Sequence, residues 1–319
     1  MNHRKPLAGF PGRAALYALA ILFCNPAFFS SSSLADDYTQ THYPIVLIHG
    51  MAGFDDILGI NYWYRIPAQL RAGGAEVYQV QVSALNQTEI RGEQAARQIE
   101  AILAASGAEK VNLIGHSHGG PTSRYVASVY PQYVASVTSV GGVNWGTPVA
   151  DATYRVGKTS TFLYALMFGP TRALGNLLDF LSGGNLPQSA EAGVFSLTTA
   201  ETERFNADYP EGMPTEYCGE GEELADNGVR YFSWTGNRPI THLADIGDYF
   251  LFASGQLIGE PNDGLVPACS THLGTVLRDT YRMNHLDEVD QLFGLHSHRD
   301  TDPVTVYRQQ ANRLKLLGL

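Results

Sequence analysis

The sequence predicts an α/β fold in which a mostly parallel sheet is covered by helices on both faces. Short apolar runs alternate with stretches of helical periodicity, the order expected of strand–helix–strand units. The apolar runs are continuous rather than alternating, which is typical of strands buried on both sides. The 319 residues are 44% apolar and 16% charged, a globular composition. No repeat, low-complexity segment or linker divides the chain, so we expect a single domain.

The strands and one long helix follow in order along the chain. Residues 44–49 read Pro-Ile-Val-Leu-Ile-His, and residues 76–82 are rich in valine. Between residues 88 and 106, Ile99, Ile102 and Leu103 recur at helical spacing, and Gly107 is a natural stop for that helix. Further strands are predicted at 111–114, 134–140 and 230–235.

The N-terminal 35 residues predict an export signal. Residues 1–13 carry Arg4, Lys5 and Arg13 without an acidic residue, and residues 14–24 form an apolar run too short for a membrane anchor. Small residues at 33 and 35 precede a predicted cleavage site after Ala35. A buried N-terminal helix is the alternative. Cleavage would leave residues 36–319 as a single mature domain and would make the protein a secreted one.

Charge and cysteine content narrow the function classes. The formal net charge is −10, and removing three basic residues with the signal would make it −13. No run of Lys and Arg occurs, so we expect no nucleic-acid partner. The two cysteines outside the signal, Cys218 and Cys269, are expected to be bridged in an exported protein, with two buried thiols as the alternative.

A candidate nucleophile follows the predicted strand at 111–114. The segment Gly115-His116-Ser117-His118-Gly119 has the pattern G-x-S-x-G, and a plausible helix follows over 123–129. On such a strand–turn–helix elbow the serine backbone is strained, and the two glycines relieve crowding. The helix N-terminus also points N–H groups at the charge that develops on a substrate. A glycine-rich turn without a role is the alternative.

A serine nucleophile requires a base and a carboxylate that orients it. Asp263 lies in a turn before an apolar stretch, and His285 follows 22 residues later. Chemistry alone favours the set Ser117, Asp263 and His285, while the other downstream histidines remain open as surface or structural residues: His242, His272, His296 and His298.

An oxyanion hole requires two N–H donors. One is expected from the amide of His118, directly after the nucleophile. The other is expected from Met51, because residues 49–53 end the first strand with two glycines that allow close approach of backbone to substrate. A turn without a role is the alternative.

Three long motifs together resemble the Pseudomonas/Burkholderia-type secreted triacylglycerol lipases. They are residues 43–54 (YPIVLIHGMAGF), 111–121 (VNLIGHSHGGP) and 281–295 (YRMNHLDEVDQLFGL). The resemblance runs from about residue 38 to residue 316 and implies an α/β-hydrolase fold that lacks the first strands of the full sheet. It also implies Ser117, Asp263 and His285 as the triad.

The same resemblance implies a cofactor, a disulfide and a partner. One structural calcium ion would be held by the side chains of Asp245 and Asp287 and the carbonyls of Gln291 and Leu295, oxygen ligands that suit this cation. By residues alone, 287–290 would be a solvated acidic loop. The family's disulfide corresponds to Cys218–Cys269. Its members need a membrane-anchored, lipase-specific foldase in the periplasm.

The predicted substrate class depends on a helical lid at about 159–183. Leu174, Leu177, Leu178 and Leu181 have the spacing of one helix face, although two core helices would fit equally well. In this family such helices open at an oil surface, so we expect a lipase acting at the lipid–water interface on long-chain acylglycerols. A carboxylesterase for short soluble esters is the alternative. Residues 141–147 depart from the family's Gly-x-Pro-His segment, so the shape of the acyl pocket is not carried over.

Overall fold

The computed structural model is built around a six-stranded parallel sheet, and it describes residues 37–51, 53, 56–57, 60–159 and 186–319. The strand order is β4-β1-β5-β6-β7-β8, and every pair of neighbours is parallel. This confirms the predicted α/β class. The strands are β1 (Ile45–Ile48), β4 (Val77–Val80), β5 (Val111–His116), β6 (Val134–Val140), β7 (Arg230–Gly236) and β8 (Thr275–Tyr281).

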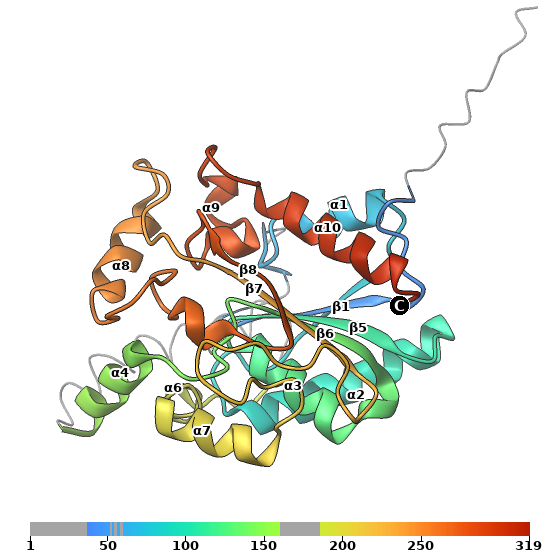
Figure 1. Cartoon of the computed structure of the whole chain (residues 1–319), viewed down its shortest axis with the longest axis horizontal. Helices are drawn as coiled ribbons and strands as arrows, with labels where there is room; N and C mark the ends of the chain where they lie inside the picture. Colours follow the sequence, from blue (N-terminus) through green and yellow to red (C-terminus); the bar gives the residue numbers. More distant parts are fainter. Residues whose placement is uncertain (1–36, 52, 54–55, 58–59, 160–185) are drawn as a thin grey trace, which may run out of the picture. The chain divides into compact units, whose positions relative to one another are not determined.

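Helices cover both faces of this sheet (Figure 1). Along β1 the side chains alternate: Ile45 and Leu47 belong to the core beneath α1 (Ile66–Ala72) and α10 (Pro303–Leu316), whereas Val46 and Ile48 belong to the opposite core. That second core is closed by α2 (Thr88–Ser106) and α3 (Gly119–Val129). Burial on both faces explains why the strands read as unbroken apolar runs.

The long predicted helix has the predicted limits. α2 ends at Ser106, and Gly107 follows with a φ of 73°, its N–H donating to the Leu103 carbonyl. Strand β4 is shorter than the predicted 76–82, and β8 was not predicted, because its side chains are only partly buried and lack a continuous apolar run.

The remaining elements lie in the connections between these strands and helices. They are β2 (Asp56–Ile57), β3 (Ile60–Asn61), α4 (Pro148–Thr159), α6 (Ala190–Phe195), α7 (Thr199–Asp208), α8 (Ile246–Gly255) and α9 (Gln291–Gly294), with 3-10 turns η1 (Pro131–Tyr133), η2 (Ala268–Thr271) and η3 (Asp287–Val289). The predicted signal peptide and, beyond Thr159, the predicted lid lie outside the described residues. Within the described part of the chain, no helix has the length and apolarity to cross a membrane.

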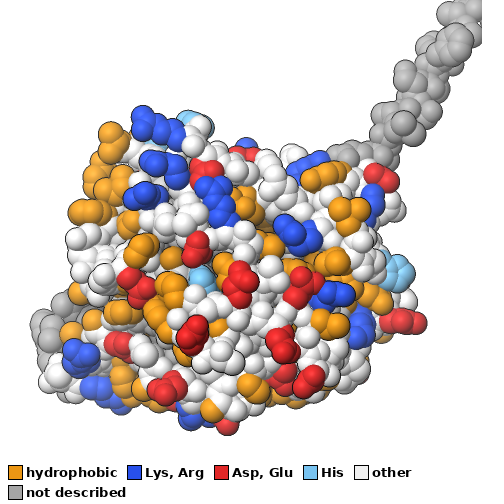
Figure 2. Space-filling model, viewed as in Figure 1, with side chains coloured by type: hydrophobic (Ala, Val, Ile, Leu, Met, Phe, Trp, Pro, Cys, Tyr) orange, Lys and Arg blue, Asp and Glu red, His pale blue; other side chains and the backbone are white. Residues whose placement is uncertain are grey.

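Surface charge is unevenly distributed on the face seen in Figure 2. Asp and Glu side chains are most frequent in its lower half, whereas one group of Lys and Arg side chains lies at its upper left beside hydrophobic side chains, with others on the right and at the lower left. The bridge predicted between Cys218 and Cys269 is present, and it ties the loop before β7 to η2, which follows the Asp263 turn. The disulfide therefore fixes the segment that follows Asp263 to the loop that precedes β7.

Candidate active site

Ser117 lies on a sharp turn between β5 and α3. Its φ is 57°, in the left-handed region, and its N–H donates to the Val140 carbonyl at 2.9 Å. A non-glycine residue held there is strained, and the backbone around it sustains the strain. The strand, turn and helix predicted around this serine are all present.

Close packing of backbone on backbone makes this elbow rigid. A Cβ atom at Gly115 would collide with the Gly119 carbonyl, and one at Gly119 would collide with the Ile48 carbonyl of β1. Both glycines are therefore required by space rather than by φ, because neither has a positive φ. The elbow can form only where residues 115 and 119 lack side chains.

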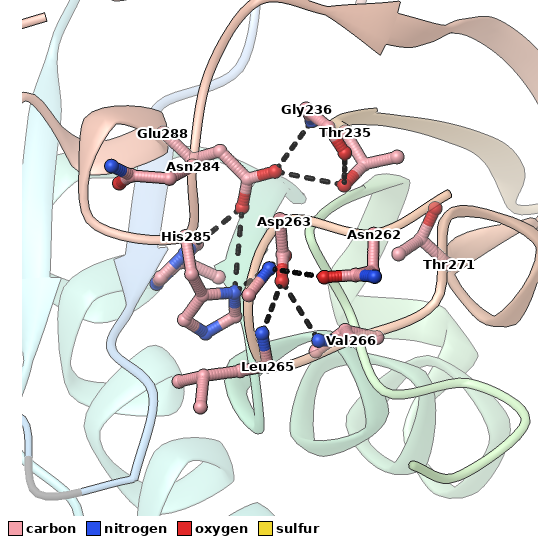
Figure 3. A network of polar contacts seen from close by, with 12 residues as sticks. Thr235, Gly236, Asn262, Asp263, Leu265, Val266, Thr271, Asn284, His285 and Glu288 are labelled. Atoms are coloured by element: carbon pink, nitrogen blue, oxygen red, sulfur yellow. Dashed lines mark hydrogen bonds and ion pairs between the residues drawn. The ribbon is translucent and has the colours of Figure 1, made fainter. Parts of the chain in front are cut away.

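His285 and Asp263 form a buried hydrogen-bonded pair (Figure 3). The imidazole Nδ1 lies 2.7 Å from Asp263 Oδ2, and the His285 N–H donates to the Asp263 carbonyl at 2.9 Å. The other carboxylate oxygen of Asp263 accepts from the amides of Leu265 and Val266. Asp263 is thereby held in one orientation, with Oδ2 presented to the histidine.

Glu288, a residue that sequence reasoning did not single out, lies on the other side of His285 Nδ1 (Figure 3). Its Oε2 is 3.7 Å from that nitrogen and 3.2 Å from His116 Nε2. Its Oε1 accepts from the Thr235 hydroxyl and the Gly236 amide. Full burial, followed by repulsion from the Asp263 carboxylate, raises the pKa of Glu288 well above its usual range. In the sequence, the only sign that Glu288 belongs to the site is its position three residues after His285.

A second histidine connects this carboxyl group to the other side of the site. His116 Nδ1 lies 2.6 Å from the Tyr62 hydroxyl, and the His116 and His285 rings are 4.5 Å apart. Burial lowers the pKa of His116 well below its usual range, so this ring is neutral. The three side chains of His116, His285 and Glu288 are close enough to hold a metal ion, but His116 Nδ1, His285 Nδ1 and Glu288 Oε1 are already engaged with Tyr62, Asp263 and Thr235.

The loop after β1 is held by a buried arginine. Arg91 of α2 donates to the carbonyls of Ser83 and His49, and at 3.4 Å to that of Gly50. The carbonyls of residues 49 and 50 therefore point toward the guanidinium of Arg91. They do not accept a hydrogen bond from the amide of Met51, the next residue. Neither Met51 N–H nor His118 N–H donates to a described backbone carbonyl. These two amides are the oxyanion-hole donors that the sequence predicts, whereas no local pattern identifies the arginine that orients the loop.

Ser117, His285 and Met51 line one cavity of about 700 Å³. Its walls are mostly apolar, with Val143, Ala150, Val194, Leu197, Phe250 and Leu292 among the lining residues. This volume and lining suit an apolar ligand that places one polar group against the serine.

The segment that departs from the family pattern forms one wall of the cavity. Val143 and Thr147 line it, and the Thr147 hydroxyl donates to the Leu265 carbonyl beside Asp263. Asn144 is fully buried and donates to Ser139 Oγ and the Thr271 carbonyl. The departure therefore changes the wall of the pocket while a buried asparagine fastens it.

The predicted calcium ligands lie next to the His285 loop. Asp245 and Asp287 are both buried, and Asp248 is close enough to raise the pKa of each. Burial is the main cause, and it raises the pKa of Asp287 to about 7. Asp287 Oδ1 is buried without a hydrogen bond to any described residue, whereas Oδ2 accepts from the Asn284 amide. The carbonyls of Gln291 and Leu295 belong to a loop in which Leu292 and Phe293 have positive φ.

Comparisons with known proteins agree with this architecture. A family model described as the alpha/beta hydrolase fold matches residues 43–171. The chain is 55% identical to a triacylglycerol lipase of Vibrio cholerae, across 88% of this chain and 90% of that protein. It is 37% identical to a triacylglycerol lipase of Pseudomonas fragi, across 89% of this chain and 100% of that protein.

The fold is also found among solved structures. A mature lipase of Bacillus licheniformis superposes with a TM-score of 0.59 at 20% identity, covering 86% of this chain and 92% of that chain. The predicted α/β-hydrolase fold and the predicted resemblance are thereby confirmed. The chain belongs to the bacterial triacylglycerol lipase family of the α/β-hydrolase superfamily, and it is a serine ester hydrolase.

Proposed function

We propose that this enzyme hydrolyses long-chain triacylglycerols with Ser117 as nucleophile, His285 as general base and Asp263 as the group that orients the histidine. The observation that carries this proposal is the hydrogen-bonded Asp263–His285 pair, whose histidine lines the same apolar cavity as a serine on a strained elbow. The apolar lining supports a substrate with long acyl chains.

The reaction uses only groups of this chain and water. His285 accepts the Ser117 hydroxyl proton as Oγ attacks the ester carbonyl carbon, and the carbonyl oxygen becomes an oxyanion. The amides of Met51 and His118 hold that oxyanion. When the intermediate collapses, the C–O bond to the alcohol breaks and His285 returns the proton to the leaving oxygen. Water, activated by the same histidine, then attacks the acyl-enzyme and releases the fatty acid.

The alternative function is that of a carboxylesterase for short soluble esters, which would use the same residues and cavity. Rates on a triglyceride series from tributyrin to triolein, below and above saturation, separate the two. For a lipase, the rate of hydrolysis should rise when the substrate forms an emulsion, and triolein should be cleaved. Ser117→Ala is the inactive control. Activity confined to dissolved tributyrin would establish the esterase instead.

We also infer a structural calcium ion held by Asp245, Asp287 and the carbonyls of Gln291 and Leu295. An orphaned buried carboxylate oxygen on Asp287 and a second buried aspartate next to the same loop fit a hard cation. When bound, the ion would supply charge balance and a cross-link between the start of α8 and the loop that follows His285. It has no part in the bond-making steps.

Export and assisted folding complete the proposal. The basic, apolar and small-residue pattern of residues 1–35 supports removal of a signal peptide, and the resemblance supports folding by a periplasmic, lipase-specific foldase. N-terminal sequencing of the secreted enzyme should begin at Asp36. Expression in the cytoplasm without the foldase should yield mostly inactive protein, and full activity there would contradict the foldase dependence.

A further inference from the structure

The surface around α8 has a composition unlike that of the rest of this acidic protein. Two segments, residues 238–257 and 282–299, form this surface. Apart from Gln256, every exposed side chain in them is apolar or basic, and none is Asp or Glu. We call these exposed side chains the outer face. They are Arg238, Ile240, Leu243, Ala244, Ile246, Tyr249, Phe250, Phe252, Ala253, Gln256, Leu257, Arg282, Phe293, His298 and Arg299.

Helix α8 is apolar on the side that it turns to solvent. Its buried stripe consists of Asp248, Leu251 and Gly255, whereas Ile246 and Phe250 are 82% and 65% exposed. A surface helix of a soluble domain normally has the reverse pattern, with polar residues outward. Leu243 and Phe293, at 77% and 73%, extend the exposed apolar area on either side of the helix. An apolar patch of this kind marks a binding surface.

Three arginines lie next to this apolar area. The Arg238 amide donates to the carbonyl of Met283, the neighbour of Arg282, and the Arg282 amide donates to Asp300, the neighbour of Arg299. The three loops therefore meet. Figure 2 shows basic side chains beside hydrophobic ones in this part of the molecule.

These arginines are not neutralised by acids of the protein. No guanidinium of the three forms an ion pair or side-chain hydrogen bond with a described residue. Asp300, the acid that lies among them, is occupied by both terminal nitrogens of Arg278. Three unpaired positive charges thus border an apolar surface on a chain whose net charge is −10.

The outer face is continuous with the cavity of the active site. Phe250 is both 65% exposed and part of the cavity lining, and Leu286 and Leu292 line the cavity beside the start of α8. A surface that binds here is therefore held against the entrance through which an acyl chain must pass.

We propose that the outer face binds a negatively charged lipid surface, with its apolar side chains inserted among acyl chains and Arg238, Arg282 and Arg299 paired with anionic head groups. Charge complementarity selects this partner, since a strongly acidic protein would otherwise be repelled by such a surface. Fatty acid released by the enzyme would make an oil surface anionic, so the proposal rests on the proposed function for its physiological setting. Its test does not require catalysis.

The test measures binding of Ser117→Ala protein to vesicles by co-sedimentation. One set of vesicles is phosphatidylcholine alone and the other is an equal mixture of phosphatidylcholine and phosphatidylglycerol. We expect at least about tenfold tighter binding to the anionic vesicles, with the difference lost at high salt. Equal binding to both sets would overturn the proposal, even if triacylglycerol hydrolysis is demonstrated.

Matched variants locate the binding surface. Replacing Arg238, Arg282 and Arg299 with Gln should remove the preference for anionic vesicles, whereas the same charge change at exposed Arg71, Arg97 and Arg313 should preserve it. Leu243→Ser should weaken binding to the anionic vesicles about tenfold, and Leu316→Ser, of equal exposure at 78%, should not. Equal losses in test and control variants would refute the assignment.

Two further measurements keep the interpretation unambiguous. The active form of the arginine variant should melt at the parent temperature and cleave a soluble butyrate ester at the parent rate. If the chain instead binds no vesicles and forms a dimer that Leu243→Ser disrupts in ultracentrifugation, the outer face is a protein interface and the proposal is wrong.

Discussion

The elbow at Ser117 and the outer face border the same cavity, yet they are built in opposite ways. Around the elbow, backbone touches backbone and the carboxylate of Asp263 has partners for both oxygens. On the other side, Asp287 keeps an orphaned buried oxygen beneath a helix that exposes Ile246 and Phe250. The histidine–aspartate pair that we propose for the chemistry has hydrogen-bond partners within the chain. The Asp287 oxygen that we propose to bind an ion and the arginine side chains that we propose to bind a lipid surface lack such partners among the described residues.

The largest effect is expected from removing the nucleophile. Ser117→Ala should lower ester hydrolysis by several orders of magnitude while leaving the melting temperature within a few degrees of the parent, because the lost oxygen has a chemical role. Asp263→Asn and His285→Ala should each be similarly severe, and combining them should add little. Titration of released fatty acid measures this, and near-parent activity in Ser117→Ala would refute the mechanism.

The rigidity of the elbow can be tested with one methyl group. Gly119→Ala should destabilise the protein by about 3 kcal/mol or prevent folding, since the new Cβ would collide with the Ile48 carbonyl of the neighbouring strand. Gly259→Ala is the matched control, because nothing lies within 4 Å of its Cβ position. Urea unfolding of both variants measures the difference in the free energy of unfolding. Equal stabilities would show that the elbow can shift to accommodate a side chain and is not rigid.

Positioning of the oxyanion loop should depend on Arg91. Lys has no forked guanidinium with which to reach the carbonyls of Ser83 and His49 together, so Arg91→Lys should lower kcat by about 10- to 100-fold with little change in KM. Arg124→Lys is the control, because this equally buried arginine binds Asn206 and the Tyr209 carbonyl elsewhere. It should lower stability alone. Steady-state kinetics on a soluble ester distinguish the two.

The buried Asp287 oxygen that lacks a hydrogen bond to any described residue predicts that calcium will change the stability of the wild type and of an Asp287 variant differently. In the wild type, calcium at a hundred times its Kd should add about 2.7 kcal/mol to the free energy of unfolding. Asp287→Asn can still accept from the Asn284 amide but lacks the buried charge, so it should match or exceed the wild type in chelator and gain little from calcium. Calorimetric melting tests this, and a full calcium response in the variant would exclude Asp287 as a ligand.

The smallest effect concerns a neutral histidine buried beside the elbow. Burial, then the charges of Arg91 and His49, hold the pKa of His118 well below its usual value. The unfolded chain takes up a proton below about pH 6.5 and the folded chain does not, so stability is lost as pH falls below that value. His118→Gln, which can still bind the Thr88 hydroxyl, should flatten this slope by about 1.4 kcal/mol per pH unit. Urea titrations between pH 6.5 and 5 measure it, and identical slopes would contradict a neutral His118.

Local signals in the sequence were sufficient to predict much of the fold and to propose the nucleophile. The strand, turn and helix around Ser117 follow from neighbouring residues, because a continuous apolar run, two glycines and a helix-forming segment act within a few positions of each other. The positions of five of the six central strands along the chain follow from the same patterns, although their order in the sheet was not predicted. His285 and Asp263 were favoured by chemistry and by the resemblance, and the fold brings them within 2.7 Å.

Only the tertiary structure decided which distant groups complete one another. Glu288 beside His116, Arg91 beneath the loop after β1 and Tyr62 against His116 join segments far apart in the chain, and no periodicity or spacing reports such contacts. The sequence also could not predict which side of α8 is exposed, because an apolar helix has the same pattern of residues whether its apolar side faces the core or the solvent. Sequence patterns record what a residue can do locally, whereas burial and partners depend on which surfaces the rest of the chain covers.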